Sequence, residues 1–91
     1  MPEKTLFESE QLMGRDAVAE YLRTLADSLE SGSDVTLRAG EQSVTMSPPG
    51  EVEFEVKAER EGPTDGDGEL SIEVELEWPE NASEGGSLSI E

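Results

Sequence analysis

Two segments in the second half of the chain alternate strictly between apolar and polar residues. Residues 52–59 place Val, Phe, Val and Ala at every second position, and residues 70–78 place Leu, Ile, Val, Leu and Trp in the same way. A period of two is that of a strand with one buried and one solvated face. Alternation this regular predicts antiparallel pairing, because an antiparallel sheet can expose one face to water.

The first half of the chain contains a segment with helical periodicity. Residues 15–31 repeat large apolar side chains at steps of four, three and four, which places on one stripe Val18, Leu22, Leu25 and Leu29. Gly14 is a suitable N-cap, and Asp16 suits the positive end of the helix dipole. Gly32 is a natural residue to end the helix.

The remaining segments complete an α+β fold. Strands are predicted at 35–39 and 44–46, joined by a turn at 40–42, and residues 5–10 read as a short first strand bearing Phe7. The predicted architecture is one helix packed on one face of a four- to five-stranded, mainly antiparallel sheet. We expect it to form a single domain over residues 1–78, followed at 79–91 by a flexible, acidic, Gly- and Ser-rich tail. The end of the tail, 87–91, alternates again, and an edge strand or a small docking segment is the alternative there.

The charge of the chain has two opposing interpretations. The 91 residues include 23 Asp and Glu against 6 Lys and Arg, a net charge of −17. Low hydrophobicity with high net charge is typical of disorder, but the apolar residues here are patterned. The alternative is a folded domain whose self-repulsion is screened by salt, since the Debye length falls to about 3 Å at 1 M ionic strength. Patterning, together with a lysine count of two, favours the salt-adapted domain.

Several classes of function are disfavoured by what the chain lacks. It contains no Cys and no His, which removes thiolate chemistry, the commonest general base and the commonest transition-metal ligand. No apolar run approaches the length of a membrane span, and the N-terminus does not resemble a signal peptide. We therefore expect a cytoplasmic, non-enzymatic protein with no cofactor, no metal site and no catalytic residues.

The organisation of the chain resembles the amphi-Trp domain family, small acidic proteins frequent in halophilic archaea. The resembling features run from Lys4 to Trp78: the helical run 18–23, the strand 35–37 followed by Gly40, the strand 54–59, and the alternating strand that ends in Trp78. Gly14 departs from the Ser or Thr expected at the N-cap. The resemblance implies the fold class and a salt-rich compartment. It implies no activity and supplies no catalytic residue.

The polar positions of the two alternating segments form the candidate interaction face. Its members are Glu53, Glu55, Glu59, Glu73, Glu75 and Glu77. Residues 51–91 hold 14 of the acids and 2 of the bases, a net charge of −12, against −5 for residues 1–50. Such a face could bind a basic partner, or it could be the solvated surface of a salt-adapted protein.

Two other features have a structural and a functional interpretation. Asp65, Asp67 and Glu69 alternate as calcium ligands do, but Leu occupies the sixth and twelfth positions where an EF-hand needs Gly and Glu, so a hairpin loop at 62–68 is favoured. Trp78 could stack on a ligand, but its phase matches the inward residues of the last strand, so a structural role is favoured.

Three hypotheses of function remain. The first is a non-catalytic protein-interaction module that binds an unknown protein partner, with self-association through a sheet edge as one form. The second is an acidic decoy that binds a basic, nucleic-acid-binding partner. The third is a carboxylate-based ion-binding protein or enzyme. Direct nucleic-acid binding is disfavoured because this surface would repel phosphates, and no membrane contact is expected.

Overall fold

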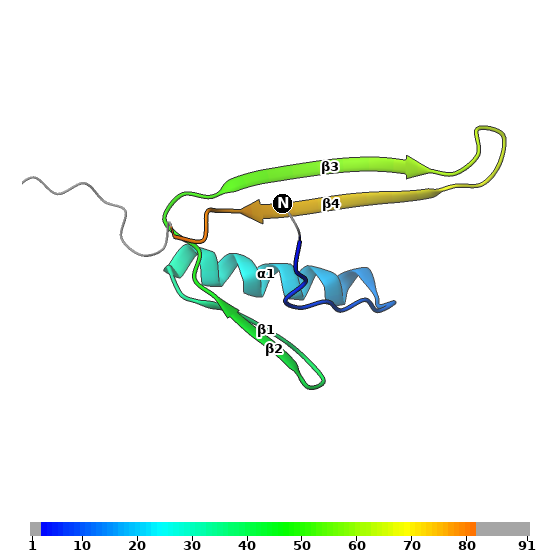
Figure 1. The fold of residues 1–91 in the computed structure, drawn as a ribbon. Coiled ribbons are helices and arrows are strands. Elements are labelled where there is room, and N and C mark those ends of the chain that lie inside the picture. Colours follow the sequence, from blue (N-terminus) through cyan, green and yellow to red (C-terminus); the bar gives the residue numbers. More distant parts are fainter. Residues whose placement is uncertain (1–2, 82–91) are drawn as a thin grey trace, which may run out of the picture. The chain divides into compact units, whose positions relative to one another are not determined.

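The fold is described by a computed structural model for residues 3–81 (Figure 1). The chain divides into two compact units, Met1–Pro48 and Pro49–Glu91. The elements in chain order are α1 (Arg15–Ser31), β1 (Val35–Ala39), β2 (Gln42–Met46), β3 (Glu53–Glu61) and β4 (Glu69–Glu77). Of the tail predicted at 79–91, residues 82–91 lie outside the described residues.

Helix α1 begins and ends at the residues that the sequence predicts. Gly14 is the N-cap in an extended conformation, and its carbonyl accepts from the N–H groups of Ala17 and Val18. Gly32 takes the left-handed conformation, with φ of 75°, which other L-residues adopt only with strain. The N–H of Gly32 donates to the carbonyl of Leu29 and so satisfies a free helix-end acceptor.

Strands β1 and β2 form an antiparallel hairpin in the first unit. The register pairs Val35 with Met46 and Leu37 with Val44, so these apolar side chains share one face of the hairpin. A two-residue turn joins the strands, with Gly40 at φ of 57°, the positive value that a type II′ turn requires at this position. β1 lies beside α1, and a shallow apolar hollow is lined by residues of both, including Tyr21 and Leu25.

The predicted first strand at 5–10 is wrong, because this segment contains no strand in the structure. Gln42 supplies part of what a pairing strand would have supplied. Its side-chain amide donates to the carbonyl of Glu8 at 3.0 Å, and its side-chain oxygen accepts from the N–H of Glu8 at 3.3 Å. Both backbone groups of one residue are thus satisfied by a single side chain, while Phe7 is half-buried.

Strands β3 and β4 form the second antiparallel hairpin, with nine residues in each strand. Their register is continuous from Glu53 opposite Glu77 to Glu61 opposite Glu69. The seven-residue loop at 62–68 confirms the predicted hairpin loop. One guanidinium nitrogen of Arg60 donates to the carbonyls of Pro63 and Gly66, at 3.0 and 2.9 Å, which ties the loop to the end of β3.

The coarse fold prediction is confirmed, and its finer part stays a prediction. The described residues contain one helix and four antiparallel strands, arranged as two two-stranded sheets. A single sheet with the helix packed on one face, and a single domain over 1–78, stay predictions. No residue in 3–81 is fully buried, and the apolar side chains of the β3–β4 hairpin are well exposed, with Ile72 at 78% and Val74 at 51%.

Candidate interaction surface

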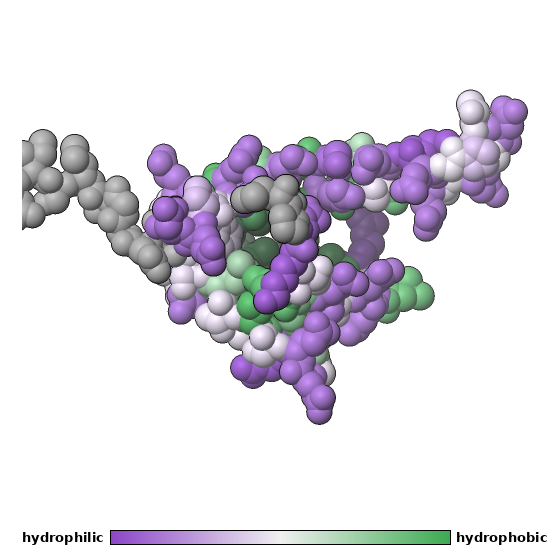
Figure 2. Space-filling view, viewed as in Figure 1, coloured by the Kyte–Doolittle hydropathy of each residue, from purple (hydrophilic) through white to green (hydrophobic). Residues whose placement is uncertain are grey.

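The register of β3 and β4 sorts their side chains onto two faces. Residues directly opposite each other in an antiparallel pair share a face, and the faces alternate along each strand. One face, here called the apolar face, carries Phe54 opposite Leu76, Val56 opposite Val74, Ala58 opposite Ile72 and Arg60 opposite Leu70. The other, here called the carboxylate face, carries the acidic residues and Lys57. Figure 2 shows hydrophilic residues dominating the visible side of this hairpin.

All six residues of the predicted interaction face lie on the carboxylate face. The register sets Glu53 against Glu77 and Glu55 against Glu75, so four of the six form two directly opposed like-charge pairs. Glu59 lies opposite Ser71. Like charges in directly opposed positions destabilise a sheet by a few tenths of a kcal/mol or more for each pair.

Lys57 partly neutralises the middle of the carboxylate face. It lies opposite Glu73 in the register, and its Nζ is 3.8 Å from Glu73 Oε2 and 3.9 Å from Glu59 Oε1. The three side chains are about half exposed, so each ion pair adds little to stability. Lys57 supplies a counter-charge only at the middle of the face. Among the described residues, the opposed pairs on either side of it have no salt bridge: Glu53–Glu77 and Glu55–Glu75 toward one end, and Glu61–Glu69 at the other.

The carboxylates at the end of the face that holds Glu53 and Glu77 shift the pKa of Glu77. The negative charge of Glu75, followed by that of Glu53, raises the pKa of Glu77 above its ordinary value of 4.5. A hydrogen bond with the Glu53 side chain and the more distant charge of Glu55 act in the same direction. The carboxyl groups of this end therefore resist being ionised together.

The raised pKa predicts how stability depends on pH. A group whose pKa is higher in the folded state contributes stability that is fully present below the unfolded value of 4.5 and is lost as the pH rises through the raised pKa. At the lowest salt concentration at which the protein stays folded, the melting temperature is expected to fall as the pH rises above 4.5. Thermal melts at constant ionic strength would measure this slope.

The control for the pH prediction is a pair of charge-neutralising variants. Glu77→Gln should flatten the slope because it removes the group whose pKa is raised, whereas Glu20→Gln on α1 should leave the slope as it is. An equal slope in the Glu77→Gln variant and the wild type would contradict the role given to Glu77.

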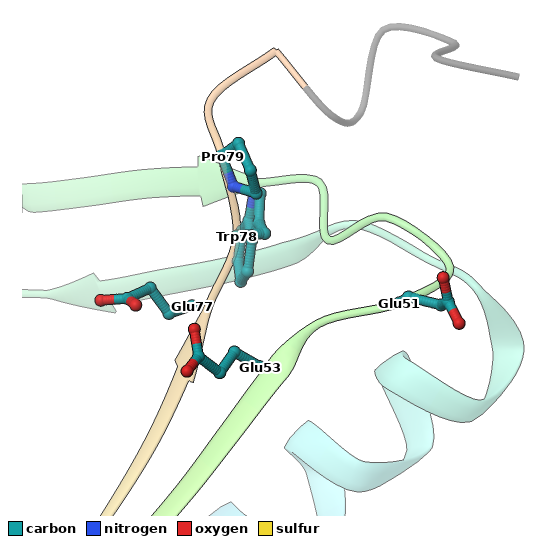
Figure 3. Close-up of a pocket in the computed structure, with 5 residues that line it drawn as sticks. All are labelled: Glu51, Glu53, Glu77, Trp78 and Pro79. Atoms are coloured by element: carbon teal, nitrogen blue, oxygen red, sulfur yellow. The ribbon is translucent and has the colours of Figure 1, made fainter.

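A shallow hollow lies at the end of the hairpin next to Trp78. It is lined by Glu51, Glu53, Glu77, Trp78 and Pro79, and Figure 3 shows the carboxylates of Glu53 and Glu77 beside each other with Glu51 apart from them. Trp78 follows the last residue of β4 and is half-buried.

Sequence reasoning missed Glu51 and Pro79 as neighbours of Trp78. Both lie outside the alternating segments that drew attention to the strands. Continuing the observed register by two residues beyond Glu53 and Glu77 would set Glu51 opposite Pro79. The register itself was therefore the signal that could have found them, but it depends on where the strands pair and cannot be read from alternation alone.

The described residues offer no group suited to a metal ion. Among residues 3–81, no three His, Cys, Asp or Glu side chains come close enough together to hold one. The carbonyls of the 62–68 loop that could have faced a cation include Pro63 and Gly66, and both accept from Arg60 instead. No helix in the described part of the chain is long and apolar enough to cross a membrane.

The strand pairing, the alternating faces and the tryptophan after the last strand define the class of the protein as a small acidic α+β domain with an amphipathic hairpin. The chain belongs to the Amphi-Trp domain family, whose model matches residues 1–91. Comparisons with curated proteins and with solved structures find no match. The resemblance seen in the sequence is thereby confirmed, and it extends over the whole chain.

Proposed function

We propose that the chain is a non-catalytic protein-interaction module of a salt-rich cytoplasm and that the carboxylate face of β3–β4 is its contact surface. The observation that supports this most is that two neighbouring pairs of glutamates lie directly opposite each other, Glu53 with Glu77 and Glu55 with Glu75. Each arrangement destabilises the free protein. A basic surface placed against the face would relieve both repulsions at once.

Electrostatics also favour a basic partner during association. Residues 51–91 carry a net charge of −12, which concentrates the negative potential on the unit that contains the hairpin. A surface of one sign steers an oppositely charged partner and raises its association rate, an advantage that decreases as salt concentration rises. The proposal therefore predicts an interaction that is faster at moderate salt than at saturating salt.

An acidic decoy for a nucleic-acid-binding protein is the second candidate. It would use the same surface, since a protein that neutralises phosphates with Lys and Arg meets a similar row of negative charges on the carboxylate face. The charge asymmetry favours this candidate over an evenly solvated surface, because the half of the chain that contains the hairpin carries the net charge of −12. The third hypothesis, an ion-binding protein or enzyme, gains no supporting observation from residues 3–81.

The apolar face of the hairpin belongs to the same proposal. An isolated two-stranded hairpin is at best marginally stable in water, and a hydrophobic face needs a covering element. The apolar stripe of α1 is the covering surface that the sequence predicts. With the apolar face covered in this way, the carboxylate face and the strand edges are the surfaces left for a partner.

The test is a pull-down at native salt from the organism's own lysate. The variant Glu55→Gln, Glu73→Gln, Glu75→Gln removes three charges from the carboxylate face and is expected to lose most of a co-purifying basic partner while keeping its fold. The matched control Glu20→Gln, Asp27→Asn, Glu30→Gln removes the same charge from α1 and should retain the partner. Retention of the same partner by both variants would mean that the carboxylate face is a solvated surface and not the contact surface.

A further inference from the structure

One edge of β4 is open within its own unit. Among the described residues of that unit, 49–81, β4 pairs only with β3, so the other side of its nine-residue backbone has no strand of the unit beside it. Open edges template the pairing of another strand, and proteins commonly blunt them with charged side chains, proline or a bulge. β4 contains no proline, its register with β3 is continuous, and all its charges are negative, so they repel another acidic strand but not a basic one.

The side chains of β4 would select a particular kind of strand. Leu70, Ile72, Val74 and Leu76 lie on the apolar face, and they alternate with Glu69, Ser71, Glu73, Glu75 and Glu77 on the carboxylate face. A strand added at the edge places its own residues beside these, about 5 Å away, on the same two faces. Aliphatic residues would then extend the apolar face, and basic residues would meet the glutamates.

On the β3 side of β4, the chain already contains one ion pair between a lysine and a glutamate of neighbouring strands. Lys57 of β3 supplies Glu73 with a counter-charge at 3.8 Å from across the strand pair. Glu75 and Glu77 face glutamates on that side instead, and no residue of 3–81 forms a salt bridge with either of them. The open side of β4 is the adjacent position from which basic side chains could supply their counter-charges.

The same charges distinguish among the alternative edges and occupants. A second copy pairing through β4 would set some of these glutamates against one another, which repeats the repulsion already present, and the rest against Ser71, which supplies no counter-charge. The edge of β3 is a poorer site for a basic strand, because Lys57 and Arg60 interrupt its acidic and apolar rows. β4 alone of the two presents aliphatic and acidic rows without a basic residue.

We propose that the open edge of β4 binds an extended segment of a partner protein in which aliphatic residues alternate with Lys or Arg. The inference rests on the proposed function, which it deepens by naming the element that binds and the sequence pattern that it recognises. Binding combines main-chain hydrogen bonds along the edge with charge pairing on one face and aliphatic contacts on the other.

The probe is a fluorescently labelled peptide of about nine residues, Lys-Val-Lys-Ile-Lys-Val-Lys-Ile-Lys, matched to the length of a strand. Fluorescence anisotropy is measured with the full chain at one salt concentration, the lowest at which the wild type and all variants stay folded by circular dichroism. Two control peptides are used. One has the same composition with its lysines clustered, and the other carries N-methyl groups on alternate residues, which removes backbone donors from one edge. Both controls should bind at least roughly ten-fold more weakly.

Two triple variants of equal charge locate the binding element. Glu73→Gln, Glu75→Gln, Glu77→Gln on β4 is expected to weaken binding roughly ten-fold or more, because it removes three cross-strand charge pairs with the lysines of the peptide. Glu53→Gln, Glu55→Gln, Glu59→Gln on β3 should weaken it less than about three-fold.

The outcomes separate this inference from the proposed function. Equal weakening by the two triple variants, with the N-methylated peptide still bound, would overturn docking at the β4 edge and leave the carboxylate face as the contact surface. Binding of the clustered peptide as tightly as the alternating one would reduce the interaction to net charge. Failure of every peptide, with the partner still captured in the pull-down, would overturn the edge inference alone.

Discussion

Lowering the salt concentration from about 2 M to about 0.05 M is expected to unfold most of the chain at room temperature. The net charge of −17 repels within a chain of only 91 residues, and dilution lengthens the range over which each charge acts, from about 3 Å at 1 M toward about 30 Å at 0.01 M. The hairpin β3–β4 is the most sensitive element, because its opposed glutamates lie one strand spacing apart. Circular dichroism across the salt series would measure the folded fraction.

The control for the salt prediction compares two double variants, one that removes charges from the β3–β4 hairpin and one that removes them from α1. The variant Glu55→Gln, Glu75→Gln deletes one opposed pair and should lower the salt concentration at which half of the protein is folded. The variant Glu20→Gln, Glu30→Gln deletes two charges from α1 and should lower it less, since these residues are not paired with like charges across a strand. An unchanged melting temperature over the whole series would show that the acidity serves another purpose.

Local periodicity and end signals were sufficient to place most elements. The helix bounds of residues 15–31 agree with α1 because glycines bracket it at both ends, and a left-handed Gly32 is hard to replace. β1 matches residues 35–39, and the 62–68 loop separates β3 from β4 as predicted. In these segments, interactions between residues close in the sequence determine the local structure.

Long-range pairing was the part that alternation could not determine. The segment at 5–10, which bears Phe7, was predicted as a strand, but it forms none in the structure, and the backbone N–H and carbonyl of Glu8 bond to the side chain of Gln42, 34 positions later. The six glutamates were correctly placed on one face, whereas their opposition depends on register. That Glu59 faces Ser71 and Glu73 faces Lys57 could be known only once the pairing was fixed.

Placing an aspartate on the apolar face is expected to have a large effect on stability. Ile72 lies opposite Ala58 on β3, and its side chain is 78% exposed in the structure. Two strands alone do not make a stable sheet, so a folded hairpin requires that this face be covered. Ile72→Asp would then bury an unpaired charge and is expected to cost at least about 3 kcal/mol of unfolding free energy.

The neighbouring residue provides the matched control for that prediction. Ser71→Asp adds the same side chain one position away, on the carboxylate face opposite Glu59, and should cost less than about 1 kcal/mol from one more like-charge pair. Denaturant unfolding at 2 M salt would measure both free energies. A large difference between the two would support the prediction that the stripe of α1 covers the apolar face. A cost for Ile72→Asp as small as that for Ser71→Asp would mean that the apolar face meets water, and the prediction of a helix packed on that sheet would then be wrong.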